Sequence, residues 1–257
     1  MMKVMTASLI PRPFSRAREK GDHWLMKLAQ PASAVTAMMA TKTGAVVLTG
    51  GTGYLGARLA ERLLARGHRV RLLVPGAAVE RAAAGAEVMV GNALDSESIA
   101  SALRPGDTLV HLVGTAHPNP AKAAEFEAVD LASIRAAVVA ASRLAIDHLV
   151  YVSVAQPAPV MHAYIAARAA GEAAIAASGL RATILRPWYV VGPGHRWPLV
   201  LTPLYALAAR VPHWRPAAQR LGLVSLEQMT RALVRAVETP PASALAIVEV
   251  PAIRAAS

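Results

Sequence analysis

From residue 44 onward, short apolar runs alternate along the chain with segments that have helical periodicity. In the segment 54–66, leucines recur on one side and arginines and a glutamate on the other, which is typical of an amphipathic helix. The pattern as a whole predicts strands at 45–49, 69–74, 87–90, 108–113, 148–153 and 183–186, and helices near 54–66, 95–103, 125–142, 161–178 and 225–238.

This regular alternation indicates one fold class. Short apolar strands separated by helices are typical of a parallel sheet that is covered on both faces. Right-handed crossover connections then give a doubly wound topology. We therefore predict an α/β fold built on a doubly wound parallel sheet within residues 44–257.

The composition agrees with a soluble globular protein. Of the 257 residues, 54% are hydrophobic and only 17% are charged, so the chain can bury a large core and is not a disordered polymer. Its longest stretch without Asp, Glu, Lys or Arg, 148–167, is interrupted by prolines, histidines and a glutamine and does not predict a membrane span. We expect a soluble, cytoplasmic protein without a transmembrane segment.

The charge and the missing cysteines narrow the chemistry. The net charge is +11, of which residues 1–43 carry +5, and the remainder is spread without a basic block, which argues against a nucleic-acid partner. The chain has no cysteine, which excludes thiolate nucleophiles and cysteine-bound metals. Its histidines have no metal-binding i, i+4 spacing on a predicted helix, so no metal site is predicted.

Residues 1–43 differ from the rest of the chain, because they are basic and lack periodic structure. A transit peptide fits their arginines, serines and few acids. An upstream misread start also fits, since Met38 and Met39 lie about ten residues before the next strong motif, where such domains usually begin. We expect this extension to be poorly ordered.

The most informative motif is a glycine-rich turn between the first strand and the first helix. Glycines there allow a tight turn, close approach of the backbone to a pyrophosphate, and close packing of the helix on the strand. The anion then lies against free N–H groups at the helix start. Two registers fit, Gly51-x-Gly53-x-x-Gly56 and Gly50-x-x-Gly53-x-x-Gly56, and the residues we expect to bind a dinucleotide are Thr49, Gly50, Thr52, Gly53, Tyr54, Leu55 and Gly56.

The sequence here resembles the extended and atypical short-chain dehydrogenases/reductases, a branch that includes NmrA-like proteins and the NAD(P)H-binding accessory subunit of complex I. The resemblance covers about 44–250 and selects the register of Gly50, Gly53 and Gly56. It rests on the glycine turn, on Gly91-Asn92-Ala93-Leu94-Asp95, on Leu149-Val150-Tyr151-Val152-Ser153 and on Leu185-Arg186-Pro187-Trp188-Tyr189-Val190-Val191-Gly192. It implies a Rossmann-type fold and further cofactor contacts from Asn92, Ala93, Val113, Gly114 and Pro187.

The resemblance also implies a catalytic centre. The family uses a serine after strand five and a Tyr-x-x-x-Lys motif on the next helix, where the lysine assists the tyrosine and holds the nicotinamide ribose. The matching residues are Ser153, Tyr164 and Arg168, so arginine replaces lysine. Arg168 could keep the positive charge beside the phenol, although the two cations differ in shape. Alternatively, Arg168 forms an ordinary surface ion pair with Glu172.

The residues at the end of the second strand bear on the choice between NAD and NADP. An NAD preference usually requires an acid there to bind the ribose 2′-hydroxyl, and Val74-Pro75-Gly76 has none. This favours NADP, with NAD as the alternative. Arg58, Arg71 and Arg81 are candidate ligands of a 2′-phosphate, and each could equally be an ordinary solvated charge.

The resemblance places a small C-terminal substrate lobe around 187–223. An aromatic and apolar pocket with a few cations suits a hydrophobic small molecule, isoprenoid- or quinone-like or with an acidic head group. The same residues could pack the cap or allow peripheral contact with a membrane or a partner. They are Trp188, Tyr189, Trp197, Tyr205 and Trp214, with His195, Arg196, His213, Arg215 and Arg220.

Two functions follow from these features. The first is an NAD(P)-dependent oxidoreductase of the short-chain dehydrogenase/reductase type that acts on an unknown hydrophobic substrate. The second is a non-catalytic NAD(P)H-binding sensor or an assembly or accessory protein, which the replaced lysine would favour. The sequence predicts no oligomeric state.

Overall fold

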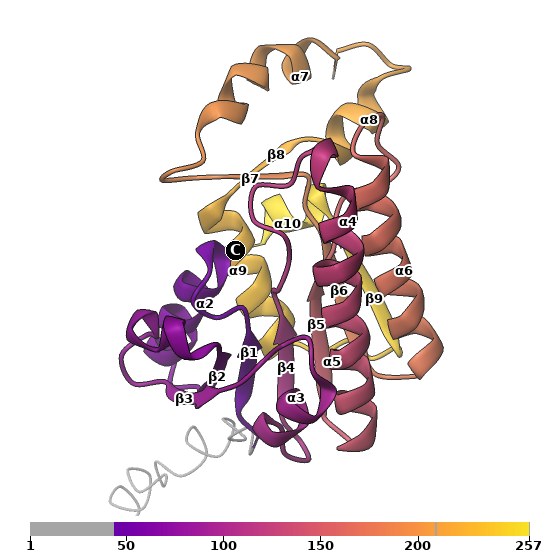
Figure 1. Ribbon diagram of the computed structural model, residues 1–257. Coiled ribbons are helices and arrows are strands. Elements are labelled where there is room, and N and C mark those ends of the chain that lie inside the picture. The colour runs from indigo at the N-terminus through magenta and orange to yellow at the C-terminus, as the bar shows by residue number, and fades with distance from the viewer. Residues whose placement is uncertain (1–43, 209, 257) are drawn as a thin grey trace, which may run out of the picture. The chain divides into compact units, whose positions relative to one another are not determined.

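A single parallel sheet organises the protein, for which the computed structural model describes residues 44–208 and 210–256. Its seven strands lie in the order β3-β2-β1-β4-β5-β6-β9 (Figure 1). The strands are β1 (Val46–Thr49), β2 (Val70–Val74), β3 (Glu87–Val90), β4 (Thr108–His111), β5 (His148–Val152), β6 (Ala182–Arg186) and β9 (Leu245–Glu249). All neighbouring pairs are parallel, so the predicted doubly wound α/β fold is confirmed.

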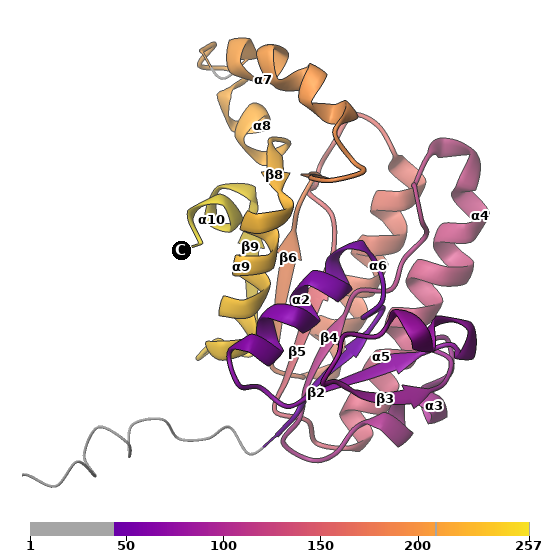
Figure 2. The same cartoon turned by 90° about the vertical axis from the view of Figure 1, so that its left-hand side faces the viewer.

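Helices cover both faces of this sheet (Figure 2). One face carries α2 (Tyr54–Ala65), α9 (Leu226–Glu238) and α10 (Val250–Ala255). The other carries α3 (Ser96–Ala102), α4 (Ala123–Glu125), the π-helix η4 (Phe126–Leu131), α5 (Ala132–Arg143) and α6 (His162–Ser178). Short 3-10 helices lie at η2 (Gly76–Arg81) and η3 (Pro120–Lys122).

The strands divide their side chains between two cores, because successive residues of a strand point to opposite faces. In β1, Val46 and Leu48 pack toward α2 and α9, whereas Val47 packs toward α3 and α5. All three are buried. β1 is therefore buried along its whole length rather than at alternate positions, as expected for a central strand of a sheet covered on both faces.

A smaller unit follows the carboxyl end of β6. It contains a two-stranded parallel sheet of β7 (Tyr189–Val191) and β8 (Leu223–Ser225). Between them lie η5 (Trp197–Leu201), α7 (Thr202–Ala208) and α8 (Arg215–Arg220). We call residues 187–223 the lobe.

The structure corrects the sequence prediction at several elements. The last strand, β9, was not predicted, and neither were β7 and β8. The strand expected at 108–113 ends at His111, and the helix expected near 125–142 runs from 123 to 143 with a π-helical part. The predicted extension, residues 1–43, lies outside the described residues. No helix in the described part of the chain has the length and apolar character needed to cross a bilayer.

A buried polar chain ties β1 to β4 and to the start of α5. The imidazole of His111 is fully buried between the hydroxyls of Thr49, at 2.8 Å from Nδ1, and Ser133, at 3.1 Å from Nε2. Ser133 in turn donates to the carbonyl oxygen of Asp130. This order of donors suits a neutral imidazole with its proton on Nε2. Burial, and then the charge of Arg168, lower the pKa of His111 to about 3.

This burial predicts that acid destabilises the protein. The unfolded imidazole takes up a proton near pH 6.5, whereas the folded one does so only near pH 3, so the stabilisation is complete above the first value and is lost as the pH falls through that window. We expect His111 to contribute a loss of about 2 kcal/mol in the free energy of unfolding between about pH 7 and pH 5. Urea titrations at both pH values would measure it.

The same titrations are made on the variant His111→Gln. Whatever its stability at neutral pH, its free energy of unfolding should lack this loss between pH 7 and pH 5. The exposed His162, substituted by Gln, is the matched control and should keep the wild-type dependence. Equal pH dependence in wild type and His111→Gln would contradict the assignment.

Candidate functional site

The glycine turn follows β1 at the point where the strand order of the sheet reverses, between β1 and β4. Ligands of open α/β sheets bind outside the carboxyl ends of strands at such a point. The helix α2 begins after Gly53, with no side-chain cap and no acidic residue in its first turn. Its first N–H groups are therefore free to bind an anion.

The glycines of the turn have different physical roles. Gly50 has φ +75°, and a Cβ on Gly56 would lie 2.2 Å from the Gly50 carbonyl oxygen, so both positions need glycine for the fold itself. Gly53 has φ −81°, which any residue adopts, and a Cβ there would meet only the Gly50 oxygen, at 3.2 Å. The exposed Gly53 therefore leaves open space at the helix start, as close approach of a pyrophosphate requires.

A pocket of about 390 Å³ adjoins this turn, and we call it the glycine pocket. Seven of the predicted cofactor-binding residues line it, namely Gly50, Thr52, Gly53, Asn92, Ala93, Val113 and Gly114. Tyr54, Leu55 and Gly56 form the first turn of α2. Thr49 is buried, with its hydroxyl on His111, and Pro187 is buried, with its carbonyl oxygen accepting from the N–H of Ala155. Neither Thr49 nor Pro187 lines the glycine pocket.

Pro75, Asn92 and Leu94 also line this pocket. The Asn92 side-chain oxygen accepts from the N–H of Leu94, at 3.0 Å, and so shapes the turn after β3. Arg71 is not a phosphate ligand, because it is buried and bound to Glu87, Asp107 and the carbonyl oxygen of Ala102. Arg58 pairs with Glu61, and neither Arg58 nor Arg81 lines the glycine pocket.

A second pocket, of about 290 Å³, contains Tyr164, and we call it the tyrosine pocket. The ring of Tyr164 packs edge-on against Phe126, with 5.0 Å between centroids. Two histidines, His117 and His195, stack in parallel, with centroids 5.1 Å apart. The lining residues are His117, Pro118, Val154, Met161, Tyr164, Trp188, Tyr189, Val190, His195 and Pro198.

Arg168 lies between the two pockets. Its Nη2 donates to Asp130 Oδ1 at 2.5 Å and lies 3.4 Å from the carbonyl oxygen of Val113 in the glycine pocket. A Cβ on Gly114 would meet this Nη2 at 2.1 Å, so only glycine fits there. On the other side, the guanidinium carbon lies 5.2 Å from the ring centre of Tyr164.

The surroundings of Arg168 keep it charged and fixed. It is 6% exposed, and the expected alternative of a surface pair with Glu172 is wrong, because the partner of Arg168 is Asp130. Asp130 also accepts from the N–H and the hydroxyl of Thr115. Burial lowers the pKa of Arg168, but Tyr164, Tyr151 and Asp130 together raise it above its ordinary value.

Ser153 is placed apart from this group. Its buried hydroxyl donates to Glu172, which also binds Gln156 and forms an ion pair with Arg186. The neighbouring residue that does line the tyrosine pocket is Val154, which carries no proton donor. The structure therefore brings Tyr164 and Arg168 together and directs the hydroxyl of Ser153 to a different set of partners.

The comparison with known families agrees with this geometry. A family model described as NAD(P)H-binding matches residues 50–195, which are more than half of the chain. The chain belongs to this NAD(P)H-binding family.

Individual relatives agree with the family. The chain is 30% identical over 215 residues to the ceramide reductase of Caulobacter vibrioides. The match covers 82% of this chain and 65% of that protein, so the chain spans slightly less than two thirds of the relative's length.

Solved structures show the same fold. A UDP-glucose 4-epimerase from Thermus thermophilus in complex with NAD has a TM-score of 0.58 at 20% identity, covering 79% of this chain and 77% of that one. A short-chain dehydrogenase/reductase superfamily protein from Agrobacterium tumefaciens with bound NAD has a TM-score of 0.58 at 17% identity, with the same coverage. The predicted NAD(P)H binding is thus confirmed by the family, and the resemblance to short-chain dehydrogenases/reductases is confirmed in fold.

The sequence analysis of this NAD(P)H-binding protein did not predict two residues of the site, Asp130 and His117. Asp130, the countercharge of Arg168, occupies the apolar face of its helix at i+4 from the buried Phe126, and a carboxylate in an apolar stripe is a usable signal. His117 lies in a loop with φ +49°, and no sequence pattern pointed to it.

The glycine pocket predicts a selective effect at Gly53. We expect Gly53→Val to weaken NADPH binding at least about 100-fold, because its side chain would fill the space at the free N–H groups of α2, while the fold is kept. Isothermal titration calorimetry with NADPH measures the affinity, and circular dichroism checks the fold. Ala65→Val, at the exposed end of the same helix, is the matched control and should bind normally. Unchanged affinity of Gly53→Val would rule out this position for the pyrophosphate.

Proposed function

We propose that the protein is an NAD(P)-dependent oxidoreductase of the short-chain dehydrogenase/reductase type that acts on a hydroxyl or carbonyl group of an apolar, lipid-like molecule. The observation that carries this proposal is the position of Arg168, which contacts the glycine pocket through Val113 and the tyrosine pocket through Tyr164. A cofactor site and a phenol on opposite sides of one fixed cation suit coupled hydride and proton transfer.

Each residue then has a stated role. When bound, the nicotinamide cofactor would supply or accept a hydride. In the direction of reduction, Tyr164 would give its Oη proton to the carbonyl oxygen of the substrate, which becomes a hydroxyl. The guanidinium of Arg168 would stabilise the phenolate that remains until it regains a proton from solvent. Because both Nη atoms of Arg168 are bound to protein oxygens, Arg168 acts as a fixed charge, and Asp130 positions it.

Ser153 has a different role in this proposal. Its hydroxyl is committed to Glu172, and Glu172 also pairs with Arg186 at the end of β6. We assign Ser153 to holding the ends of β5 and β6 against α6, rather than to proton transfer.

The lining of the tyrosine pocket supports an apolar substrate. In the described part of the chain, none of its lining residues carries a carboxylate, an ammonium or a guanidinium group. A nucleotide sugar would need cations for its pyrophosphate, whereas a lipid needs apolar walls with a few polar atoms near the reacting group. Tyr164 and the two histidines supply those polar atoms.

The names of the relatives point in the same direction. One relative is named a ceramide reductase, and a shorter match of 37% identity over 75 residues is to a 3β-hydroxysteroid dehydrogenase/Δ5→4-isomerase of Mycobacterium tuberculosis. Both names describe reactions on lipids. They give the enzyme more support than the alternative of a non-catalytic binding protein.

Replacing the phenol tests the proposed reaction. With a long-chain keto lipid as substrate and NADPH as reductant, we expect Tyr164→Phe to lower kcat at least about 100-fold, the usual contribution of a positioned general acid. Its affinity for NADPH should stay within a few-fold of wild type. Tyr189→Phe removes a hydroxyl from the same pocket and is the matched control, with activity close to wild type. Full activity of Tyr164→Phe would exclude it as the proton donor.

We further propose that NADP is the preferred nucleotide, because Pro75 stands where an acid would repel a 2′-phosphate. Calorimetry should show tighter binding of NADPH than of NADH. Pro75→Asp should weaken NADPH binding about tenfold and leave NADH binding unchanged or tighter, since one new carboxylate would face the 2′-position. Equal affinities of wild type for both nucleotides would contradict the preference, even if turnover is confirmed.

A further inference from the structure

The outer surface of the lobe has an unusual combination of side chains. Among the lobe residues whose side chains the structure describes, four large apolar ones are exposed, at 49% for Leu199, 72% for Val200, 59% for Leu207 and 56% for Trp214. The other exposed large apolar residues among those described are distributed over several elements, such as Val90 on β3 and Val139 on α5. Four exposed apolar side chains within the segment 199–214 make this part of the lobe a candidate interaction surface.

The charge of the lobe has one sign. Between Arg186 and Glu227 the sequence contains no Asp or Glu, while it contains Arg196, Arg210, Arg215 and Arg220. Arg196 and Arg210 are exposed. Such a surface is complementary to an anionic partner.

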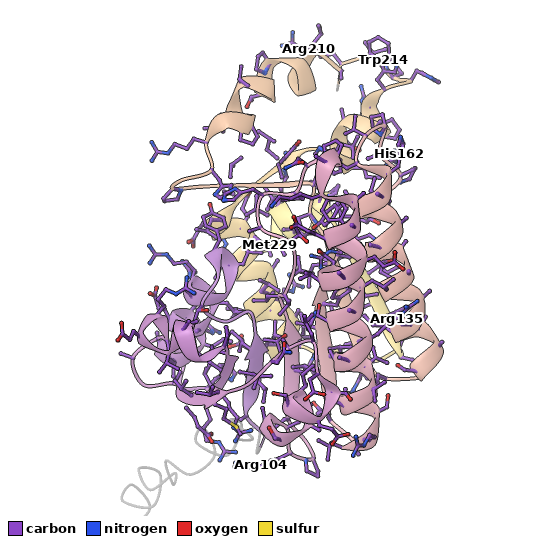
Figure 3. All side chains as sticks on the ribbon, in the orientation of Figure 1. Arg104, Arg135, His162, Arg210, Trp214 and Met229 are labelled. Carbon is purple, nitrogen blue, oxygen red and sulfur yellow. The ribbon has the colours of Figure 1, made fainter. Side chains whose placement is uncertain are left out.

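Few neighbouring elements pack against α7. α7 packs chiefly against η5 and α8, rather than against the helices of the main sheet. Figures 1 and 2 both show α7 beyond β8, on the side away from the main sheet, and Figure 1 shows it beyond β7 as well. In Figure 3, Arg210 and Trp214 lie at the end of the lobe farthest from that sheet.

We propose that this surface, formed by Leu199, Val200, Leu207 and Trp214 with Arg196 and Arg210, docks on an anionic lipid bilayer. Apolar side chains and a tryptophan would enter the boundary between head groups and acyl chains, while the arginines would bind lipid phosphates. The absence of acids in the lobe favours a bilayer over a protein partner, whose surface would present both signs of charge.

Docking would serve the proposed function, on which this part of the inference rests. The lobe itself supplies Tyr189, His195 and Pro198 to the tyrosine pocket. Docking through the lobe would therefore bring that pocket to the surface of the phase in which an apolar substrate is dissolved. Binding to the bilayer needs no turnover, so it can be tested separately from the reaction.

The test is co-sedimentation of the full chain with vesicles of phosphatidylcholine and phosphatidylglycerol in equal parts, compared with phosphatidylcholine alone. We expect binding to the anionic vesicles that weakens at high salt. Trp214→Glu and Leu207→Glu should each lower the partition coefficient at least about tenfold, because each removes an inserting apolar group. Arg196→Gln with Arg210→Gln should lower it by about tenfold or more on anionic vesicles only. Val139→Glu, on the exposed face of α5, is the matched control and should bind like wild type.

Every variant retains residues 1–43, so a basic extension that bound lipid by itself would leave all of them bound. Equal binding of the lobe variants and wild type would therefore overturn the proposal, as would absence of binding to anionic vesicles. If vesicles are not bound and the protein self-associates in a manner that Trp214→Glu abolishes, the surface is an interface with a second copy, which also overturns it. Calorimetry with NADPH on each variant, without lipid, verifies that the glycine pocket is intact.

Discussion

The buried guanidinium of Arg168 is the constraint on which the site depends. An isolated charge of this kind costs several kcal/mol to remove from water, so it requires a countercharge and hydrogen-bond acceptors close by. Asp130 supplies the charge, and the carbonyl oxygens of Val113 and Val152 accept from the same group. These partners come from η4 and from the ends of β4 and β5. Arg168 is therefore held in contact with residues of both the glycine pocket and the tyrosine pocket.

The two pockets differ in the way they are built. The glycine pocket is lined by glycines and small or apolar residues beside the uncapped start of α2, where Gly53 leaves space for an anion. The tyrosine pocket is formed by aromatic and apolar side chains, and Tyr164 is placed in it by Phe126 and by the cation below. Backbone N–H groups recognise a phosphate whatever the substrate is, whereas the side chains of the second pocket determine what is reduced or oxidised.

The lobe contributes both to the tyrosine pocket and to the exposed surface of the protein. Residues after β6 supply part of the tyrosine pocket on the inner side and the exposed Leu207 and Trp214 on the outer side. A short helix that packs on few neighbours cannot bury all of its apolar side chains. The remaining apolar surface and its uniform positive charge are therefore properties of one segment, and both suit access to a lipid phase.

The sequence by itself determined six of the seven strands of the main sheet, the glycine turn and the spacing of Tyr164 and Arg168, because hydrophobic periodicity and turn chemistry are local properties. It missed β9, a short edge strand whose apolar run has no distinctive period. Only the tertiary structure decided the partners of the polar groups. Asp130 rather than Glu172 pairs with Arg168, and Glu172 instead receives the hydroxyl of Ser153. Which groups pair depends on which strand ends and helix faces meet after packing. A carboxylate four residues away in the helix is not preferred over one that the sheet brings close.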